Sequence, residues 1–195
     1  MKLFKKNRVH MIIGIIVGIV AVMAVAGMVF VNQPRFGRTP RGERLERVKN
    51  SPHYKDGQFR NLHPTVMMTS QKGRLGAFWG FLFKKEENLR PDKEIPVVKI
   101  DLKKIGKDEN VLVWFGHSSY LIQIDGKRIL VDPVFCMASP VSFINKPFRG
   151  TDAYKPDDMP DIDYLVISHD HWDHLDYQTV MQLKNRVVKV VCPLG

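Results

Sequence analysis

A dense group of metal-binding residue types lies in residues 169–174 (HDHWDH), close to the end of the chain. Neutral imidazole binds zinc and similar ions well, and carboxylate neutralises part of the charge of a divalent ion. Residues two apart on an extended loop face the same way, so His169 and His171 can bind one ion together. Asp173 and His174 follow where the chain turns toward a helix and can face a second ion. Two ions about 3.5–4 Å apart can stabilise a tetrahedral or phosphoryl transition state. The run therefore predicts a binuclear site for zinc or a similar ion.

The spacer residues Asp170 and Trp172 receive no ligand role. Three further residues have two interpretations each. Asp176 can cap the following helix or support a ligand histidine, and both interpretations are kept open. Asp132 ends a strand-like run and can either cap a turn or point at the metal pocket. His117 lies in a turn, where a lone histidine is more often structural than functional.

The elements that must position these residues are short β-type runs separated by turns. A buried run, Asp161–Ser168, leads directly into the histidines, and helical spacing follows over Leu175–Asn185. Asp125-Gly126 between two runs is a strong hairpin signal because both turn residues must tolerate positive φ. The other predicted strands are Val97–Leu102, Val111–Phe115, Tyr120–Ile124, Arg128–Val131 and Val187–Cys192. Strands that feed a helix and a new strand predict an α/β sandwich, with the metal residues at the carboxyl end of a strand.

Other apolar features are less specific. Leu75–Phe83 (LGAFWGFLF) is too short to span a membrane; we expect a core helix in preference to a patch resting on lipid. The two cysteines, Cys136 and Cys192, form no disulfide framework, although one bond between them stays open. Each is predicted to be a small buried hydrophobic residue, as free cysteine usually is.

The N-terminal region contains a continuous apolar segment over residues 11–31, without a charged group. As a helix it would be about 31 Å long, which matches a hydrocarbon core of about 30 Å. The competing interpretation is a cleaved signal peptide, with Ala24-Val25-Ala26 as the cleavage pattern. Residues 27–31 stay apolar beyond that pattern, which favours an uncleaved single-pass anchor.

Positive charge concentrates around this segment. Residues 1–50 hold ten Lys or Arg and two Glu, whereas the rest of the chain is nearly neutral, although the whole chain has a net charge of +10. This distribution suits an anionic membrane surface and argues against a nucleic-acid partner. Basic residues lie on both sides of the span, so orientation is not fixed; we lean toward an extracytoplasmic domain. The predicted parts are a basic tail (1–10), the span (11–31), a basic juxtamembrane linker (32–50) and a domain (51–195).

Three stretches together resemble the metallo-β-lactamase superfamily. They are Trp114–Tyr120 (WFGHSSY), Ile129–Pro140 (ILVDPVFCMASP) and Leu165–Tyr177 (LVISHDHWDHLDY). Among its branches, the N-acylphosphatidylethanolamine phospholipase D group looks most similar, and Arg44–Asn61 and residues 192–195 (CPLG) add to this likeness. The resemblance covers most of residues 44–195. The histidine motif alone identifies only the superfamily.

The resemblance implies a four-layer αββα fold with two zinc ions and the hydrolysis of esters, lactams or phosphodiesters. This branch releases N-acylethanolamine and phosphatidic acid from a membrane lipid. His169 and His171 would bind the first ion, and Asp173 and His174 the second. Asp173 would also orient the attacking water. Trp172 replaces a tyrosine that is common in the family.

The departure from the family is at the C-terminus. The family completes its site with a third histidine, a bridging aspartate and a final histidine, and this sequence has none of them after residue 174. We therefore expect the N-terminal half of the domain, with an exposed apolar sheet face, four protein ligands for two ions and no activity by itself.

Three functions are consistent with these features. The favoured one is a membrane-anchored zinc phosphodiesterase that acts on lipids. A lactonase or other hydrolase of a soluble substrate would share the histidine motif. A non-catalytic, membrane-bound fragment is the third.

Overall fold

The computed structural model describes residues 2–65, 73–84, 87, 89–141 and 145–194 of the chain. The chain divides into two compact units, residues 1–39 and 40–195.

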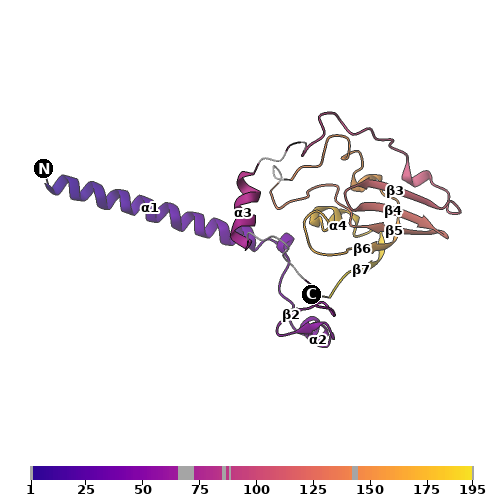
Figure 1. Ribbon diagram of the computed structural model, residues 1–195, viewed down its shortest axis with the longest axis horizontal. Coiled ribbons are helices and arrows are strands. Elements are labelled where there is room, and N and C mark those ends of the chain that lie inside the picture. The colour runs from indigo at the N-terminus through magenta and orange to yellow at the C-terminus, as the bar shows by residue number, and fades with distance from the viewer. Residues whose placement is uncertain (1, 66–72, 85–86, 88, 142–144, 195) are drawn as a thin grey trace. The chain divides into compact units, whose positions relative to one another are not determined.

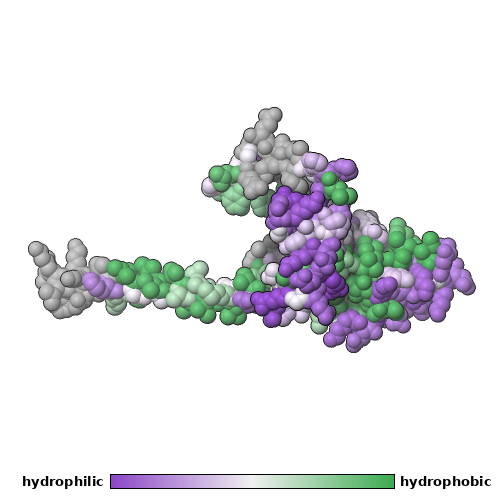
Figure 2. Space-filling view, turned by 90° about the horizontal axis from the view of Figure 1, so that it is seen from below, coloured by the Kyte–Doolittle hydropathy of each residue, from purple (hydrophilic) through white to green (hydrophobic). Residues whose placement is uncertain are grey.

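The first unit is dominated by one helix, α1 (Lys2–Val31), which ends near a short 3-10 helix at Pro34–Phe36. The segment His10–Val31 is long and apolar enough to cross a membrane, and none of it is buried within the protein. Figure 2 shows its apolar residues as a long green stretch. The ring of Phe30 packs edge-on against Phe36 at 5.1 Å, where the helix ends. The predicted helix is present; its insertion in a membrane remains a prediction.

The second unit begins with small elements. Helix α2 (Glu43–Lys49) buries Val48, and strands β1 (Tyr54–Lys55) and β2 (Gln58–Phe59) form a two-residue antiparallel pair. Helix α3 (Gly73–Phe83) forms over the apolar stretch described above. The preferred core interpretation of this stretch was wrong, because its large side chains are exposed, Leu75 to 76% and Phe81 to 85%.

A five-stranded sheet forms the body of the unit, in the order β3-β4-β5-β6-β7 (Figure 1). The strands are β3 (Val111–Gly116), β4 (Ser119–Ile124), β5 (Lys127–Val131), β6 (Ile162–Val166) and β7 (Val187–Val191). The first three are antiparallel neighbours, and β5, β6 and β7 run parallel. Asp125 and Gly126 both have positive φ in the β4–β5 turn, as the hairpin signal predicted.

The connection between β6 and β7 contains helix α4 (Tyr177–Leu183), because parallel strands need a crossover segment. The mixed α/β architecture predicted from the sequence is therefore present. The prediction of a strand at Val97–Leu102 was wrong. No strand forms there, and a 3-10 helix, η2 (Leu102–Lys104), begins at the last residue of this range. Leu102 is buried and fixes this segment to the core, and the residues before it form a loop.

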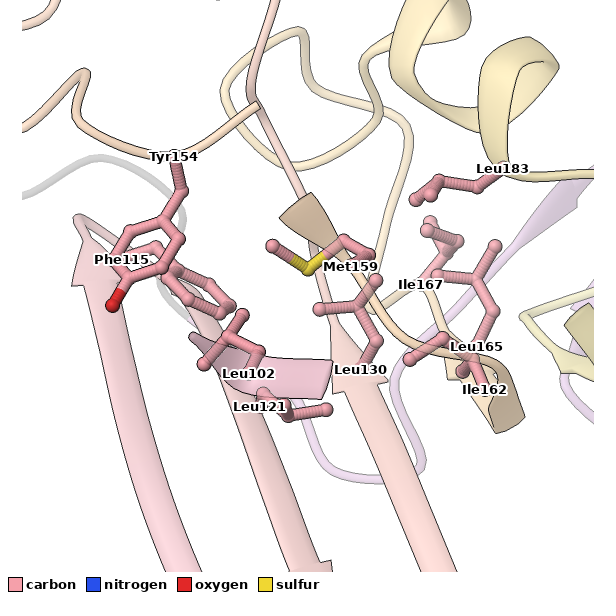
Figure 3. Packing of buried hydrophobic residues seen from close by; sticks show 10 residues of the cluster. All are labelled: Leu102, Phe115, Leu121, Leu130, Tyr154, Met159, Ile162, Leu165, Ile167 and Leu183. Atoms are coloured by element: carbon pink, nitrogen blue, oxygen red, sulfur yellow. The ribbon is translucent and has the colours of Figure 1, made fainter. Parts of the chain in front are cut away.

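One face of the sheet carries the core (Figure 3). Leu121, Leu130 and Leu165 project from neighbouring strands, Leu183 reaches them from α4, and Met159 follows the 3-10 helix η3 (Pro156–Asp158). The opposite face is apolar but open, with Leu112 exposed to 67%, Trp114 to 64% and Tyr164 to 36%. The expectation of an exposed apolar sheet face is confirmed. The cysteine prediction was wrong: Cys136 and Cys192 are both exposed and free.

Candidate metal centre

The predicted metal residues lie on the loop between β6 and α4, directly after the carboxyl end of β6. The rings of His169 and His171 approach to 4.6 Å between centroids, and those of His169 and His174 to 3.9 Å. The loop turns back on itself because the backbone N–H groups of His174 and Leu175 both donate to the carbonyl of His171, at 3.0 and 2.7 Å. This turn brings three imidazoles together from a stretch of six residues.

A second element contributes to the same place. The Nε2 atom of His117, from the turn between β3 and β4, lies 3.0 Å from Oδ2 of Asp173. Ligand atoms of His117, Asp173 and His174 all lie within 4.8 Å of one another, close enough to hold an ion. Asp173 and His174 are half-buried, whereas His117 is exposed. The structure thus brings His117, for which the sequence favoured a structural role, to the predicted ligands.

Asp132 organises the buried side of the cluster. It is 3% exposed at the end of β5, and its Oδ2 accepts from Nδ1 of His174 at 2.9 Å. Its oxygens also accept from the backbone N–H of Ser168 at 2.7 Å and from the Ser168 hydroxyl at 2.6 Å. Burial raises the pKa of Asp132, but the hydrogen bonds from His174 and Ser168 outweigh it, so that its pKa is lowered. Asp132 is therefore a carboxylate at neutral pH.

This hydrogen-bond arrangement fixes the protons of two imidazoles. A carboxylate only accepts, so Nδ1 of His174 carries the hydrogen that points at Asp132. The Ser168 hydroxyl donates to Asp132, so its oxygen accepts from Nδ1 of His169 at 2.9 Å. The nitrogen that can bind a metal ion in each of these rings is then Nε2. Hydrogen bonds of this kind orient metal-binding histidines and raise their basicity.

Two serines of the β3–β4 hairpin bond the backbone of Asp173 in the metal loop and of Asp132 at the end of β5. Ser118 donates to the carbonyl of Asp173 at 3.4 Å, and the buried Ser119 donates to the carbonyl of Asp132 at 2.6 Å. Asp132 itself has a positive φ of 42°, an uncommon backbone conformation for a residue other than glycine. Ser118, Ser119 and Ser168 were not singled out in the sequence. The only sequence feature that indicated a role for them was their place close to a histidine at the end of a strand-like run.

Asp176 has a different position from the other supporting residues. It is 1% exposed, and it caps α4 by accepting from the N–H of Gln178 at 3.1 Å and the Thr179 hydroxyl at 2.6 Å. It also accepts from the backbone N–H groups of Cys136 and Met137. These four bonds favour the capping interpretation over support of a ligand histidine. Asp170, predicted to be a spacer, is exposed.

Comparison with known proteins gives this arrangement a family context. The β-lactamase superfamily domain matches residues 111–192, the segment from β3 to the end of β7 that contains the whole cluster. Residues 111–192 form a domain of the metallo-β-lactamase superfamily. An uncharacterized protein of Mycobacterium tuberculosis is 35% identical over 136 residues, which cover 69% of this chain and 37% of that protein.

Two other superfamily relatives have named activities. The N-acyl-phosphatidylethanolamine-hydrolyzing phospholipase D 1 of Caenorhabditis elegans is 34% identical over 122 residues, 56% of this chain and 33% of that enzyme. A metal-dependent hydrolase of Aeropyrum pernix is 31% identical over 80 residues, 41% of this chain and 28% of that protein. These matches cover between 28% and 37% of the relatives' own length.

The donors present fit a divalent metal ion. Imidazoles with a free Nε2 and a half-buried carboxylate are the ligand types that zinc and several transition metals prefer. The Asp132 carboxylate accepts from Nδ1 of His174, so this hydrogen bond orients the ring and leaves Nε2 free for an ion. The ligand roles of His169, His171, Asp173 and His174 remain predictions, and so does the choice of zinc.

Proposed function

We propose that this chain forms the histidine-bearing part of a metal-dependent phosphodiesterase that hydrolyses N-acylphosphatidylethanolamine-like lipids at a membrane surface. The observation that carries the proposal is the joint cluster of His117, His169, His171, Asp173 and His174. Its support by Asp132 and Ser168 distinguishes it from surface histidines that are near each other by chance.

The lipid substrate is supported by two independent features. The nematode relative is named for hydrolysis of N-acyl-phosphatidylethanolamine, and its match covers 56% of this chain. Helix α1 is long and apolar enough to hold the chain at a bilayer, where such a substrate resides. The basic residues around it complement an anionic membrane surface.

The chain's own residues have distinct parts in the proposed reaction. His169 and His171 would hold one divalent ion, and Asp173 and His174 another. Bound ions of this kind lower the pKa of water and stabilise negative charge on a phosphoryl group. Asp173 would accept a hydrogen from the attacking water and so orient it toward phosphorus. Asp132 and Ser168 keep the Nδ1 protons of His174 and His169 in place, so that both Nε2 atoms stay available.

The function is tested with the whole enzyme of which this chain is proposed to form a part, purified from its native membranes, with and without His171→Ala introduced in its gene. The substrate is N-acylphosphatidylethanolamine in vesicles, and N-acylethanolamine release is measured by mass spectrometry. We expect release that a chelator removes, that added zinc restores and that His171→Ala abolishes. Asp170→Ala is the matched control and should retain release. Unchanged release in His171→Ala would overturn the proposal, and hydrolysis of soluble lactones alone would replace it with the lactonase alternative.

The 195 residues by themselves are proposed to be inactive. Among the described residues, the cluster offers five ligand side chains, and catalytic zinc usually has three protein ligands for each ion. The purified chain, loaded with zinc, should therefore release no N-acylethanolamine. Turnover that disappears in His171→Ala would contradict this count and indicate that a second copy completes the site.

A further inference from the structure

His117 is the one member of the cluster that comes from outside the β6–α4 loop. It lies in the two-residue connection between β3 and β4, where Gly116 pairs with Ser119. The sheet register shifts just before this turn, between Trp114 and Gly116. Such an irregularity redirects the side chains that follow it.

The turn holds His117 in an uncommon conformation. Its φ is +45°, at a position where two-residue hairpins favour glycine or asparagine. Its carbonyl accepts a hydrogen bond from Nε1 of Trp114 at 2.9 Å, which fastens the turn to the strand before it. Gly116, with a φ of +111°, lets the chain pass within contact of Thr151, since an added Cβ would lie 3.2 Å from the Cβ of Thr151. A conformation that the surroundings enforce in this way is frequently found at functional sites.

The imidazole of His117 faces the proposed second ion. Its Nε2 lies 3.0 Å from Oδ2 of Asp173, and its ring lies 5.2 Å from that of His174, at an interplanar angle of 70°. Ser118, the next residue, bonds the backbone of Asp173, so the hairpin and the metal loop are joined at two points. The position of His117 is thus set against Asp173 by backbone as well as by side chain.

We propose that His117 is a third protein ligand of the divalent ion held by Asp173 and His174. The inference rests on the proposed metal-dependent function. Two ligands each about 2.0–2.1 Å from one ion lie about 2.9–3.4 Å apart at octahedral to tetrahedral angles. The separation of 3.0 Å between Nε2 and Oδ2 falls within this interval. With His174, whose Nδ1 is already bonded to Asp132, the three residues supply two imidazoles and one carboxylate.

A simple hydrogen bond from His117 to Asp173 is the competing explanation of the same distance. In that case His117 would position the carboxylate without touching the ion. The two explanations differ in the number of histidines bound to metal, which spectroscopy counts directly. They also differ in the size of the effect, because removing an outer hydrogen-bond partner costs about 10–100-fold in metal affinity.

The experiment uses the purified full chain in detergent, loaded with Co²⁺. Each histidine bound to cobalt gives one strongly shifted, exchangeable N–H proton signal in NMR spectra. His117→Asn is expected to lose one such signal and to weaken binding of one cobalt equivalent by more than about 100-fold. Asparagine tolerates positive φ, so the turn is preserved, and His117→Gly is the second variant for the same reason. His63→Ala, which removes an exposed histidine from outside the cluster, should change neither readout.

Each outcome has one meaning. An unchanged signal count with weaker binding would overturn the ligand proposal in favour of a positioning role. Unchanged binding would exclude both roles for His117. If His169→Ala and His174→Ala remove signals while His117→Asn does not, this inference fails and the proposed function stands. If the unmodified chain binds no cobalt, the ligand proposal fails, while the proposed function is decided by N-acylethanolamine release from vesicles.

Discussion

Asp132 shows how one buried carboxylate can control several metal-binding groups. It accepts hydrogen bonds from His174 and from both the backbone and the hydroxyl of Ser168. Through Ser168 it also fixes the Nδ1 proton of His169. The orientation of two histidines therefore depends on a residue that touches no ion in the proposed arrangement.

Replacement of Asp132 by asparagine should weaken metal binding without removing a ligand. The asparagine amide would present a donor where Ser168 and His174 now donate, so both histidines would lose their fixed orientation. We expect affinity to fall about 10–100-fold, as measured by competition with a coloured chelator. Asp161→Asn, an exposed carboxylate before β6, is the control and should leave affinity unchanged. Equal affinity in Asp132→Asn would show that the hydrogen bonds do not orient the ligands.

Substitution within the histidine run should separate ligands from spacers. His169→Ala and His171→Ala each withdraw an imidazole from one ion, so most of that ion should be lost. Asp170 is exposed and should be replaceable by alanine with metal content nearly intact. Elemental analysis of the purified variants measures this. Equal metal loss in Asp170→Ala and His169→Ala would mean that the assigned roles are wrong.

The site could be predicted from the sequence only where its residues are adjacent in the chain. The four residues of the histidine run share one loop, so their spacing alone indicates their proximity. His117 and Asp132 reach the cluster from two other strand ends, 57 and 42 residues before His174 in the chain numbering. Their place depends on the sheet order and on positive-φ turns, which no local pattern encodes. Ser168 was overlooked because its role depends on the burial of Asp132.

At the scale of elements, Asp176 joins α4 to the segment that follows β5. Its carboxylate caps the helix and accepts from the N–H groups of Cys136 and Met137 at 2.7 and 3.0 Å. The neighbouring Thr179 is fully buried. Its hydroxyl donates to this carboxylate and accepts a hydrogen bond from the backbone N–H of Phe135. The start of α4 and the chain segment over residues 135–137 are therefore held as one unit.

Asp176→Ala should destabilise the domain while leaving the metal ligands in place. It removes a helix cap, worth about 0.5–2 kcal/mol, and leaves backbone donors without partners, at about 1–3 kcal/mol. We expect the free energy of unfolding to fall by roughly 2–3 kcal/mol, since the two costs overlap. Near-ultraviolet circular dichroism during urea denaturation measures it. Asp152→Ala, at an exposed aspartate, is the control. A loss of metal without a loss of stability would instead favour a role in supporting the ligands.

Strands β5 and β6 are held together by Asp163 as well as by their ladder. Its carboxylate accepts from the N–H of Arg128 at 3.0 Å and from Nζ of Lys127 at 3.1 Å. The backbone hydrogen bond from Arg128 is the main cause that lowers the pKa of Asp163, although burial opposes it. A carboxylate with a lowered pKa stabilises the fold at pH above its unfolded value of about 4. This stability is lost as pH falls through the lower, folded pKa.

Asp163→Asn should therefore remove a pH-dependent part of the stability. At pH 7 the variant should unfold about 1 kcal/mol more easily, a value kept small because the group is partly exposed. The difference from the unmodified chain should shrink as the pH is lowered from about 5 to below 4. Thermal unfolding at several pH values measures it. A difference that stays constant across this interval would show that the carboxylate charge does not contribute.

Element prediction succeeded where a pattern was set by burial on the sheet and failed elsewhere. The runs that became β3 to β6 alternate or concentrate apolar residues because each has one face in the core, whereas β7 packs only Val187 against it. Val97–Leu102 has the same composition, yet only Leu102 is buried there, so the residues before it follow a loop. Leu75–Phe83 became a helix as proposed, but its side chains are exposed, and sequence alone gave no measure of that.

At the scale of the whole molecule, charge and apolar surface are distributed very unevenly. The basic excess lies in residues 1–50, on both sides of the apolar part of α1. The second unit has its own core, and its residues form a compact body without the first. This division fits the proposal that α1 anchors the chain at a membrane and that the second unit binds the metal ions.

The last prediction concerns α1 as an anchor. Apart from Phe30, its large apolar side chains from Met11 to Val31 are 53–69% exposed, so in water they would lack the burial that stabilises apolar residues. A bilayer supplies that burial, and a helix satisfies its own backbone hydrogen bonds there. We expect the chain to fractionate with membranes and to resist extraction by alkaline carbonate.

Removal of residues 1–39 should release the second unit, because the two are separate compact units. If the gene for the full chain instead yields a soluble protein that begins at Gly27, residues 1–26 are a cleaved signal peptide. Retention on membranes after removal of residues 1–39 would assign membrane binding to the second unit, where α3 presents exposed aromatic side chains.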